Sequence, residues 1–137
     1  MIITGGIYKG RKITVPSEKI TRPTLSKVRM GVFNTLYSVL VNFEGKSFLD
    51  LFGGSGIMGI EAKSRGFDNI TVFEKNVSAF KIIEKNYAEL KIKADIKMGD
   101  SLKLIKISDK IFDVVYVDPP YANELLYDEV LNLLQDK

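Results

Sequence analysis

The sequence of 137 residues contains no cysteine, which excludes disulfide bonds, thiolate metal sites and mechanisms with a cysteine nucleophile. It contains no histidine either, which excludes histidine acid–base catalysis, Ser-His-Asp triads and most zinc sites. No apolar run approaches the roughly 20 residues that span a bilayer, and the first residues lack a signal-peptide layout. We therefore expect a soluble cytoplasmic protein without a metal or membrane partner. Its chemistry must depend on Asp, Glu, Tyr, Lys, Asn, backbone groups or a cofactor.

The charges are distributed unevenly along a chain whose composition fits one globular domain. Residues 1–30 carry seven basic side chains and one acidic one, whereas the remaining 107 residues carry 13 basic and 16 acidic ones. A basic arm on a slightly acidic body suggests a polyanionic partner that is held at one end. A solvated basic surface explains the charge count equally well.

The pattern of apolar residues predicts three successive parts of a single domain. Residues 1–23 are expected to form a basic arm, with two short strands joined by a turn near residues 8–11. In the second part, residues 24–45, an apolar stripe at three- to four-residue steps predicts a helix to about Leu40, capped by Thr24 or Ser26. The third part, residues 46–137, alternates strands and helices.

This alternation predicts a Rossmann-like, doubly wound α/β fold with a mostly parallel sheet. Strands are expected at 47–51, 69–73, 95–98 and 112–117, of which the first, second and fourth are nearly continuous apolar runs. Helices are expected at about 57–65, 77–90 and 101–107, and another is expected to begin near Asn123.

A glycine loop follows the first predicted strand and opens the first helix of this third part. Gly54, Gly56 and Gly59 have the G-x-G-x-x-G spacing, which lets a backbone turn sharply beside a ligand. A tight turn without a ligand is the alternative reading. Glu74 ends the second predicted strand, where an acid can accept both hydroxyls of an adenosine ribose. Asp50 favours the cationic S-adenosylmethionine over NAD, because a carboxylate would repel a pyrophosphate.

Asp100 follows the third predicted strand and has two possible roles. Its carboxylate can accept a hydrogen bond from an adenine amino group or cap the helix that follows. The sequence favours neither role.

The tetrapeptide Asp118-Pro119-Pro120-Tyr121 follows the fourth predicted strand. A carboxylate and a rigid carbonyl there could accept both protons of an exocyclic amine and free its lone pair to attack a sulfonium methyl group. Tyr121 could stack on the base that carries the amine. A strand-to-loop turn with an Asp cap is the simpler alternative.

These motifs and several others together form an extended pattern. It comprises Gly5-Gly6, Tyr8-Lys9-Gly10-Arg11-Lys12, Thr21-Arg22-Pro23-Thr24, Val28-Arg29, Phe48-Leu49-Asp50-Leu51-Phe52-Gly53-Gly54-Ser55-Gly56, Gly59-Ile60-Glu61-Ala62, Ser64-Arg65-Gly66 and Asp118-Pro119-Pro120-Tyr121. The pattern closely resembles the bacterial RsmD-type guanine-N2 methyltransferases of small-subunit ribosomal RNA, which are class I S-adenosylmethionine-dependent enzymes.

The resemblance implies methylation of a guanine N2 amine in 16S ribosomal RNA within an assembling 30S subunit, with S-adenosylhomocysteine as the second product. It implies catalytic roles for Asp118, Pro119 and Tyr121. The cofactor contacts expected are Asp50, Phe52, Gly53, Gly54, Gly56, Glu74, Lys75, Asp100, Ser101 and Asp118. The RNA contacts expected are Lys9, Arg11, Lys12, Arg22 and Arg29.

Members of this family usually continue for about three more strands in the sheet order 3-2-1-4-5-7-6. Without them, the predicted strand 112–117 would be an exposed apolar edge through which copies could associate. Three other functions stay open: methylation of DNA adenine-N6 or protein glutamine-N5, RNA binding without catalysis, and NAD-dependent oxidoreduction. Cytosine-C5 methylation is excluded because it needs a cysteine nucleophile.

Overall fold

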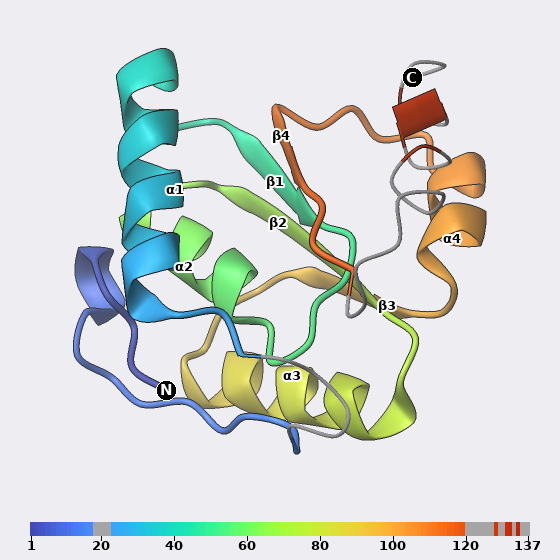
Figure 1. Cartoon of the computed structure of the whole chain (residues 1–137), viewed down its shortest axis with the longest axis horizontal. Helices are drawn as coiled ribbons and strands as arrows, with labels where there is room; N and C mark the ends of the chain where they lie inside the picture. Colours follow the sequence, from blue (N-terminus) through green and yellow to red (C-terminus); the bar gives the residue numbers. More distant parts are fainter. Residues whose placement is uncertain (18–22, 120–127, 129–130, 133, 135–137) are drawn as a thin grey trace.

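The structure is a computed structural model that describes residues 1–17, 23–119, 128, 131–132 and 134. Four parallel strands form one sheet in the order β3-β2-β1-β4 (Figure 1). This order confirms the predicted Rossmann-like α/β fold for the described part of the sheet. The strands are β1 (Ser47–Asp50), β2 (Asn69–Glu74), β3 (Asp95–Met98) and β4 (Val114–Tyr116).

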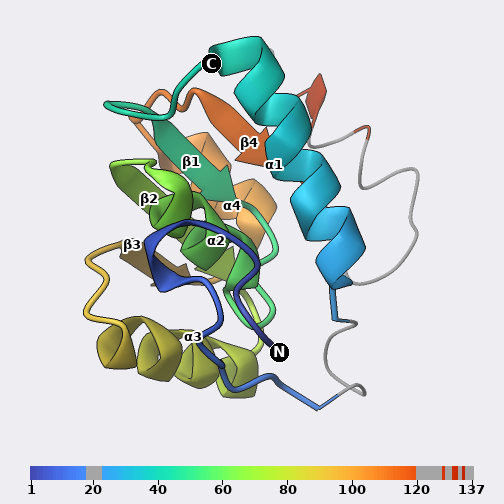
Figure 2. The same cartoon turned by 90° about the vertical axis from the view of Figure 1, so that its left-hand side faces the viewer.

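Helices cover both faces of the sheet (Figure 2). On one face, α1 (Ser26–Leu40), α2 (Ile57–Arg65) and α3 (Val77–Glu89) pack on the larger apolar core, which includes Phe48, Val72 and Ile83. On the other face, α4 (Ser101–Ile107) packs on a smaller core around Leu49 and Phe73. Asn123, where a further helix is predicted to begin, lies outside the described residues.

The prediction that Thr24 or Ser26 caps α1 is wrong. The N-cap residue is Leu25, and no side chain caps the helix. The predicted apolar stripe is confirmed in part: Val32, Leu36 and Leu40 pack against the larger core, whereas Leu25, Val28 and Val39 are exposed. Arg29 and Phe33 are buried on the same face. Arg29 can be buried on this face because its guanidinium has a buried carboxylate partner, Glu61 of α2.

The N-terminal arm, which we define as residues 1–17, is paired as predicted but does not form two regular strands. A single antiparallel bridge joins Ile2 to Lys12, and a short 3-10 helix, η1 (Gly6–Tyr8), lies at the tip. Regular pairing stops because the Thr4 amide donates to the Glu61 carboxylate and the Tyr8 amide donates to the Ser64 hydroxyl, both on α2. Residues 4–8 of the arm are therefore attached to α2.

Strand β4 lies at the edge of the described sheet and pairs with β1. It is three residues long, shorter than the six predicted, and its side chains are half-buried. Association of copies through this edge stays a prediction. None of the helices in the described parts of the chain is long and apolar enough to cross a membrane.

Candidate functional site

Four acidic residues lie at the carboxyl edge of the parallel sheet. Asp50 ends β1 and Glu74 ends β2, while Asp100 follows β3 and Asp118 follows β4. Because parallel strands end at the same edge, the strand order places these acids in the row Asp100, Glu74, Asp50, Asp118. Ligands of open α/β sheets bind at this edge. In the part of the chain that the structure describes, no group of acids is arranged to hold a metal ion.

The glycine loop between β1 and α2 has the geometry that its spacing predicts. Gly54 and Gly56 have positive φ angles of 62° and 81°, which glycine adopts without strain. A β-carbon on Gly59 would lie 2.2 Å from the Tyr87 hydroxyl oxygen, so glycine is needed for the close approach of α2 to α3. The glycine loop therefore lies where its spacing predicts it, and α2, which begins at the end of the loop, packs closely on α3.

Glu74 is bound to the glycine loop. One of its carboxylate oxygens accepts a hydrogen bond from the Gly54 amide at 2.7 Å, and the other accepts from the Asn76 amide at 2.8 Å. Each carboxylate oxygen can accept a further hydrogen bond. Glu74 is therefore fixed beside the loop and half-buried, with capacity left for a ligand hydroxyl.

Asp50 is buried beside two other acids. Its Oδ1 accepts a hydrogen bond from the Phe52 amide at 3.1 Å, and its residue exposure is 1%. Burial raises the pKa of Asp50 from 3.8 to about 7; the Phe52 amide opposes this shift, and the charges of Glu74 and Asp118 add to it. A cationic group at this edge would relieve the repulsion, so the acids suit a ligand with positive charge.

The raised pKa predicts that Asp50 weakens the fold as the pH rises. The folded state favours the protonated carboxyl, so its contribution to stability is complete below pH 3.8 and is lost as the pH rises through about 7. Asp50→Asn should therefore leave the free energy of unfolding nearly unchanged at pH 4 and raise it by on the order of 4 kcal/mol at pH 8. Urea unfolding at both pH values measures this difference. A gain that is equal at pH 4 and pH 8, or equal to that of exposed Asp109→Asn, would contradict the account.

The helix-capping role of Asp100 is confirmed. Its Oδ1 accepts from the amides of Leu102 and Lys103, at 3.0 and 3.2 Å, at the start of α4. Contact of Asp100 with adenine stays a prediction. Ser101 is 6% exposed, and its hydroxyl donates to the Leu51 carbonyl. The Ser101 hydroxyl thus holds α4 against the end of β1 rather than facing the edge of the sheet.

The Asp118-Pro119 segment leaves the sheet at the same edge. Pro119 is buried and Asp118 is half-buried. The hydroxyl of Tyr116, two residues earlier on β4, lies near Asp118 and Thr24. Burial raises the pKa of Tyr116 to about 12, and the charges of Asp118 and Asp50 add to the shift. The Tyr116 hydroxyl is thus neutral beside Asp118. The predicted stacking residue Tyr121 lies outside the described residues.

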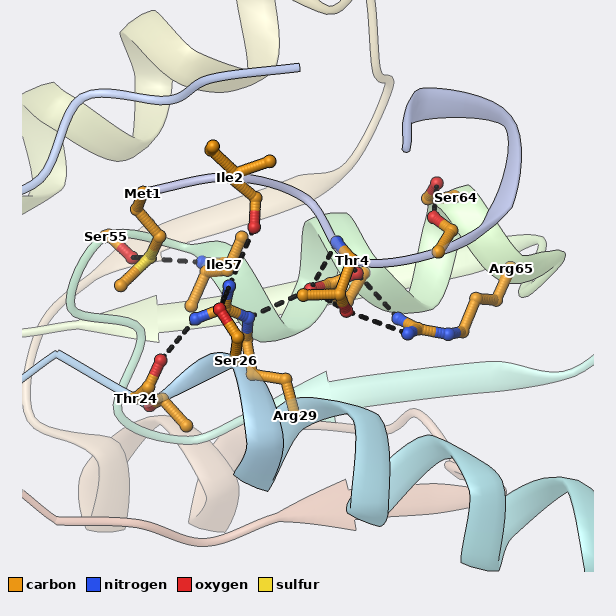
Figure 3. Close-up of polar contacts among 12 residues, drawn as sticks. Met1, Ile2, Thr4, Thr24, Ser26, Arg29, Ser55, Ile57, Ser64 and Arg65 are labelled. Atoms are coloured by element: carbon orange, nitrogen blue, oxygen red, sulfur yellow. Dashed lines mark hydrogen bonds and ion pairs between the residues drawn. The ribbon is translucent and has the colours of Figure 1, made fainter. Parts of the chain in front are cut away.

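The prediction that Arg29 contacts RNA is wrong for this structure, because its guanidinium lies inside the protein (Figure 3). Its Nε donates to Glu61 at 2.9 Å, while its terminal nitrogens donate to Ser26 and to the carbonyls of Ile2 and Thr24. Glu61 is fully buried. It also accepts from Arg65 at 2.6 Å, and the backbone amide and hydroxyl of Thr4 donate to it as well. The Arg29–Glu61 pair therefore joins α1, α2 and the N-terminal arm.

The other predicted RNA and cofactor contacts that the structure describes lie on the N-terminal arm and in the loops after β1 and β2. Lys9, Arg11 and Lys12 are exposed on the N-terminal arm, and the Arg11 guanidinium lies 6.0 Å from the centre of the Tyr8 ring. Arg22 lies outside the described residues. Phe52 is half-buried and Gly53 is buried in the loop after β1, whereas Lys75 is exposed after β2.

Two side chains of α3 that the motifs did not reveal donate hydrogen bonds to the glycine loop. The Tyr87 hydroxyl donates to the Gly56 carbonyl at 3.0 Å, and the Asn86 amide donates to the Ser55 carbonyl at 3.0 Å. Both are buried in α3. A polar residue on the apolar face of the helix predicted at 77–90 was the available signal, since a buried amide needs partners.

Comparison with known proteins agrees with this geometry. A family profile described as "Conserved hypothetical protein 95" matches residues 1–137. The curated "Ribosomal RNA small subunit methyltransferase D" of Escherichia coli strain K12 is 36% identical over 135 residues, which are 98% of this chain and 66% of that protein. The protein of the same name from Haemophilus influenzae is 33% identical over 137 residues, with coverage of 96% and 69%.

Two solved structures show the same fold. The Escherichia coli protein yhhF has a TM-score of 0.86 and 35% identity, with coverage of 99% of this chain and 73% of that one. The tRNA (uracil-54, C5)-methyltransferase of Pyrococcus abyssi, solved in complex with S-adenosyl-L-homocysteine, has a TM-score of 0.51 and 29% identity, with coverage of 73% and 25%.

The sheet order, the glycine loop and these similarities define the class: the chain has the Rossmann-like fold of class I methyltransferases. Within that class, it belongs to the Conserved hypothetical protein 95 family, the RsmD family, as its sequence resemblance indicated. The chain spans just under two thirds, 66%, of the length of its Escherichia coli relative.

Proposed function

We propose that this protein uses S-adenosylmethionine to methylate the N2 amine of a guanine in 16S ribosomal RNA, within the assembling 30S subunit in the cytoplasm. The observation that carries the cofactor assignment is the buried carboxylate of Asp50, flanked by Glu74 and Asp118 beside the glycine loop. The sulfonium and ammonium groups of S-adenosylmethionine would supply the positive charge that relieves the repulsion among these acids. The names of the relatives and the S-adenosyl-L-homocysteine bound by the Pyrococcus enzyme support the same cofactor.

Some residues at the carboxyl edge would bind the cofactor, and others would bind the amine. Glu74 would hold the ribose hydroxyls, Gly54 and Gly56 would let the backbone approach the cofactor, and Asp50 would face its cationic part. When bound, the cofactor supplies a methyl group on a positively charged sulfur. Asp118 and the Pro119 carbonyl would accept the two amine protons, so that the nitrogen lone pair is free to accept the methyl group. The proton that the amine then loses would go to Asp118 or to water.

The test is transfer of labelled methyl groups from S-adenosylmethionine to 30S subunits that lack this methylation. Nucleosides from the digested product should carry the label on guanine N2. Label on adenine or on a glutamine side chain would contradict the proposed substrate. RNA binding without cofactor binding would instead favour a non-catalytic RNA-binding protein.

Replacing Glu74 should weaken cofactor binding. Glu74→Gln keeps the size of the side chain but removes the charge that a ribose hydroxyl would meet. A charge-assisted hydrogen bond contributes roughly 1.5–3 kcal/mol, so the dissociation constant for S-adenosylhomocysteine should rise by about 10- to 150-fold. Calorimetry measures the change, with exposed Glu84→Gln as the matched control. An unchanged dissociation constant would remove Glu74 from the cofactor site.

The exposed bases of the N-terminal arm should contribute to RNA binding through phosphate contacts. Replacing Lys9, Arg11 and Lys12 together by alanine should lower the affinity and reduce the slope of log affinity against log salt by about 2–3. Titration of a 16S RNA fragment at several salt concentrations measures the slope. The control replaces three exposed lysines outside the arm, Lys93, Lys103 and Lys106, by alanine. Equal slopes for the two variants would show that the arm is an ordinary basic surface.

A further inference from the structure

The N-terminal arm and the glycine loop are far apart in the sequence but share one buried side chain. Asn86 of α3 is 1% exposed, and its amide makes three hydrogen bonds. Its Oδ1 accepts from the Thr14 amide at 3.0 Å and its Nδ2 donates to the Thr14 carbonyl at 2.8 Å. The same Nδ2 donates to the Ser55 carbonyl at 3.0 Å. Asn86 thus bonds both backbone groups of Thr14, as a neighbouring strand would. The second N–H of its side-chain amide donates to the glycine loop.

Ser55 lies in the loop between Gly54 and Gly56, so its carbonyl sets the orientation of a peptide group within the loop. The next residue of α3, Tyr87, binds the Gly56 carbonyl. Helix α3 therefore holds two successive loop carbonyls, while Glu74 holds the Gly54 amide from the other side. With glycines on either side of Ser55, these contacts rather than side-chain sterics fix the shape of the loop.

The first residue of the arm contacts the same part of the loop. The Ser55 hydroxyl donates to the Met1 sulfur at 3.7 Å, and the Met1 carbonyl accepts from the Ile13 amide at 2.9 Å. Figure 3 shows Met1 beside Ser55. Both segments of the paired arm, one beginning at Met1 and the other containing Thr14, thus converge on Ser55. None of the arm residues in these contacts is a predicted cofactor contact.

We propose that Asn86 is a positioning residue for the cofactor site, because its buried amide ties the N-terminal arm to the glycine loop and so holds the loop in its ligand-binding shape. This inference rests on the proposed S-adenosylmethionine site. It makes the arm part of the cofactor site as well as a basic surface. Binding of S-adenosylhomocysteine should therefore stabilise the arm, and loosening the arm should weaken cofactor binding.

The first test is amide hydrogen exchange on the unaltered chain with and without S-adenosylhomocysteine. Saturation should slow exchange of the Thr14 amide at least tenfold, together with the Gly56 amide. Slower exchange at Gly56 with no change at Thr14 would overturn the inference. No change at either amide, with no heat of binding, would count against the proposed cofactor instead.

The second test needs no ligand. In the free protein, Asn86→Ala should speed exchange of both the Thr14 and the Gly56 amides, while amides of β2 keep their protection. Lys85→Ala is the matched control, because Lys85 is exposed and contacts the Thr14 hydroxyl, at 3.3 Å, and Glu89 of the same helix, at 3.9 Å. Unchanged exchange at Gly56 in Asn86→Ala would overturn the inference. If Asn86→Ala does not fold, Asn86→Ser takes its place, since serine can still donate one hydrogen bond.

Where cofactor binds, a third readout separates positioning from a general loss of stability. Asn86→Ala should raise the dissociation constant for S-adenosylhomocysteine at least tenfold at a temperature where the variant is fully folded. Lys85→Ala should leave it unchanged. An unchanged dissociation constant for folded Asn86→Ala would show that Asn86 only stabilises the fold.

Discussion

Asp118→Ala should lower the rate of methyl transfer by roughly 10²–10⁴-fold, the range that a positioned proton acceptor contributes. The half-buried Asp118 carboxylate lies at the edge of the sheet beside the Tyr116 hydroxyl, and the proline ring of buried Pro119 restricts the backbone next to it. Alanine removes both the charge and the acceptor oxygens. The affinity for S-adenosylhomocysteine should change little, because Asp50 and Glu74 stay in place. Methyl transfer to deficient 30S subunits and calorimetry measure the two effects.

Two further variants refine this prediction. Asp118→Asn keeps one acceptor oxygen and should retain more activity than Asp118→Ala, because one amine proton still has a partner. Asp109→Ala removes an exposed carboxylate elsewhere and should leave the rate unchanged. Equal losses of transfer and of cofactor affinity in Asp118→Ala would show that Asp118 serves the cofactor rather than the amine.

Glu61→Gln should destabilise the protein by roughly 3–5 kcal/mol, because it leaves the buried guanidinium of Arg29 without a counter-charge. Glu61 is fully buried and accepts from Arg29, Arg65 and Thr4, so its loss affects α1, α2 and the N-terminal arm together. The same energy corresponds to a fall in Tm of about 10–20 °C for a domain of this size. Urea and thermal unfolding measure the change.

The controls for Glu61 separate burial from charge. Glu89→Gln breaks an exposed pair with Lys85, whose atoms are 3.9 Å apart, and should cost less than about 1 kcal/mol. Replacing both buried partners, as Arg29→Met with Glu61→Leu, should recover part of the lost stability, since the buried Arg29 charge is then gone and only the more exposed Arg65 loses its partner. A Glu61→Gln variant as stable as Glu89→Gln would mean that water reaches the Arg29 guanidinium.

The strands and the acids at their ends could be predicted from the sequence because both depend on local patterns. Apolar runs between helical segments place β1 and β2, and Asp50 and Glu74 are the acids that end these runs. The helix-capping alternative for Asp100 was also available, since it depends on the next three residues. The ends of the elements were less certain: β4 lacks the first two residues and the last residue of the strand predicted at 112–117.

The sequence could not reveal which polar residues are buried. Arg29 was expected among RNA contacts because a basic residue in a basic segment is usually exposed. Its partner Glu61 lies 32 positions away, and only the packing of α1 on α2 brings the two together. Asn86 was missed for the same reason, because its partners Thr14 and Ser55 lie 72 and 31 positions away. Charge counts along a chain cannot distinguish such residues from surface bases.

The most direct test of the proposed cofactor site is a calorimetric titration of this chain with S-adenosylhomocysteine, with NAD as the control ligand. The acids at the carboxyl edge predict binding of S-adenosylhomocysteine alone, because its ammonium group suits Asp50 whereas a pyrophosphate would be repelled. Binding of NAD alone, or of neither ligand by protein that circular dichroism shows to be folded, would contradict the assignment.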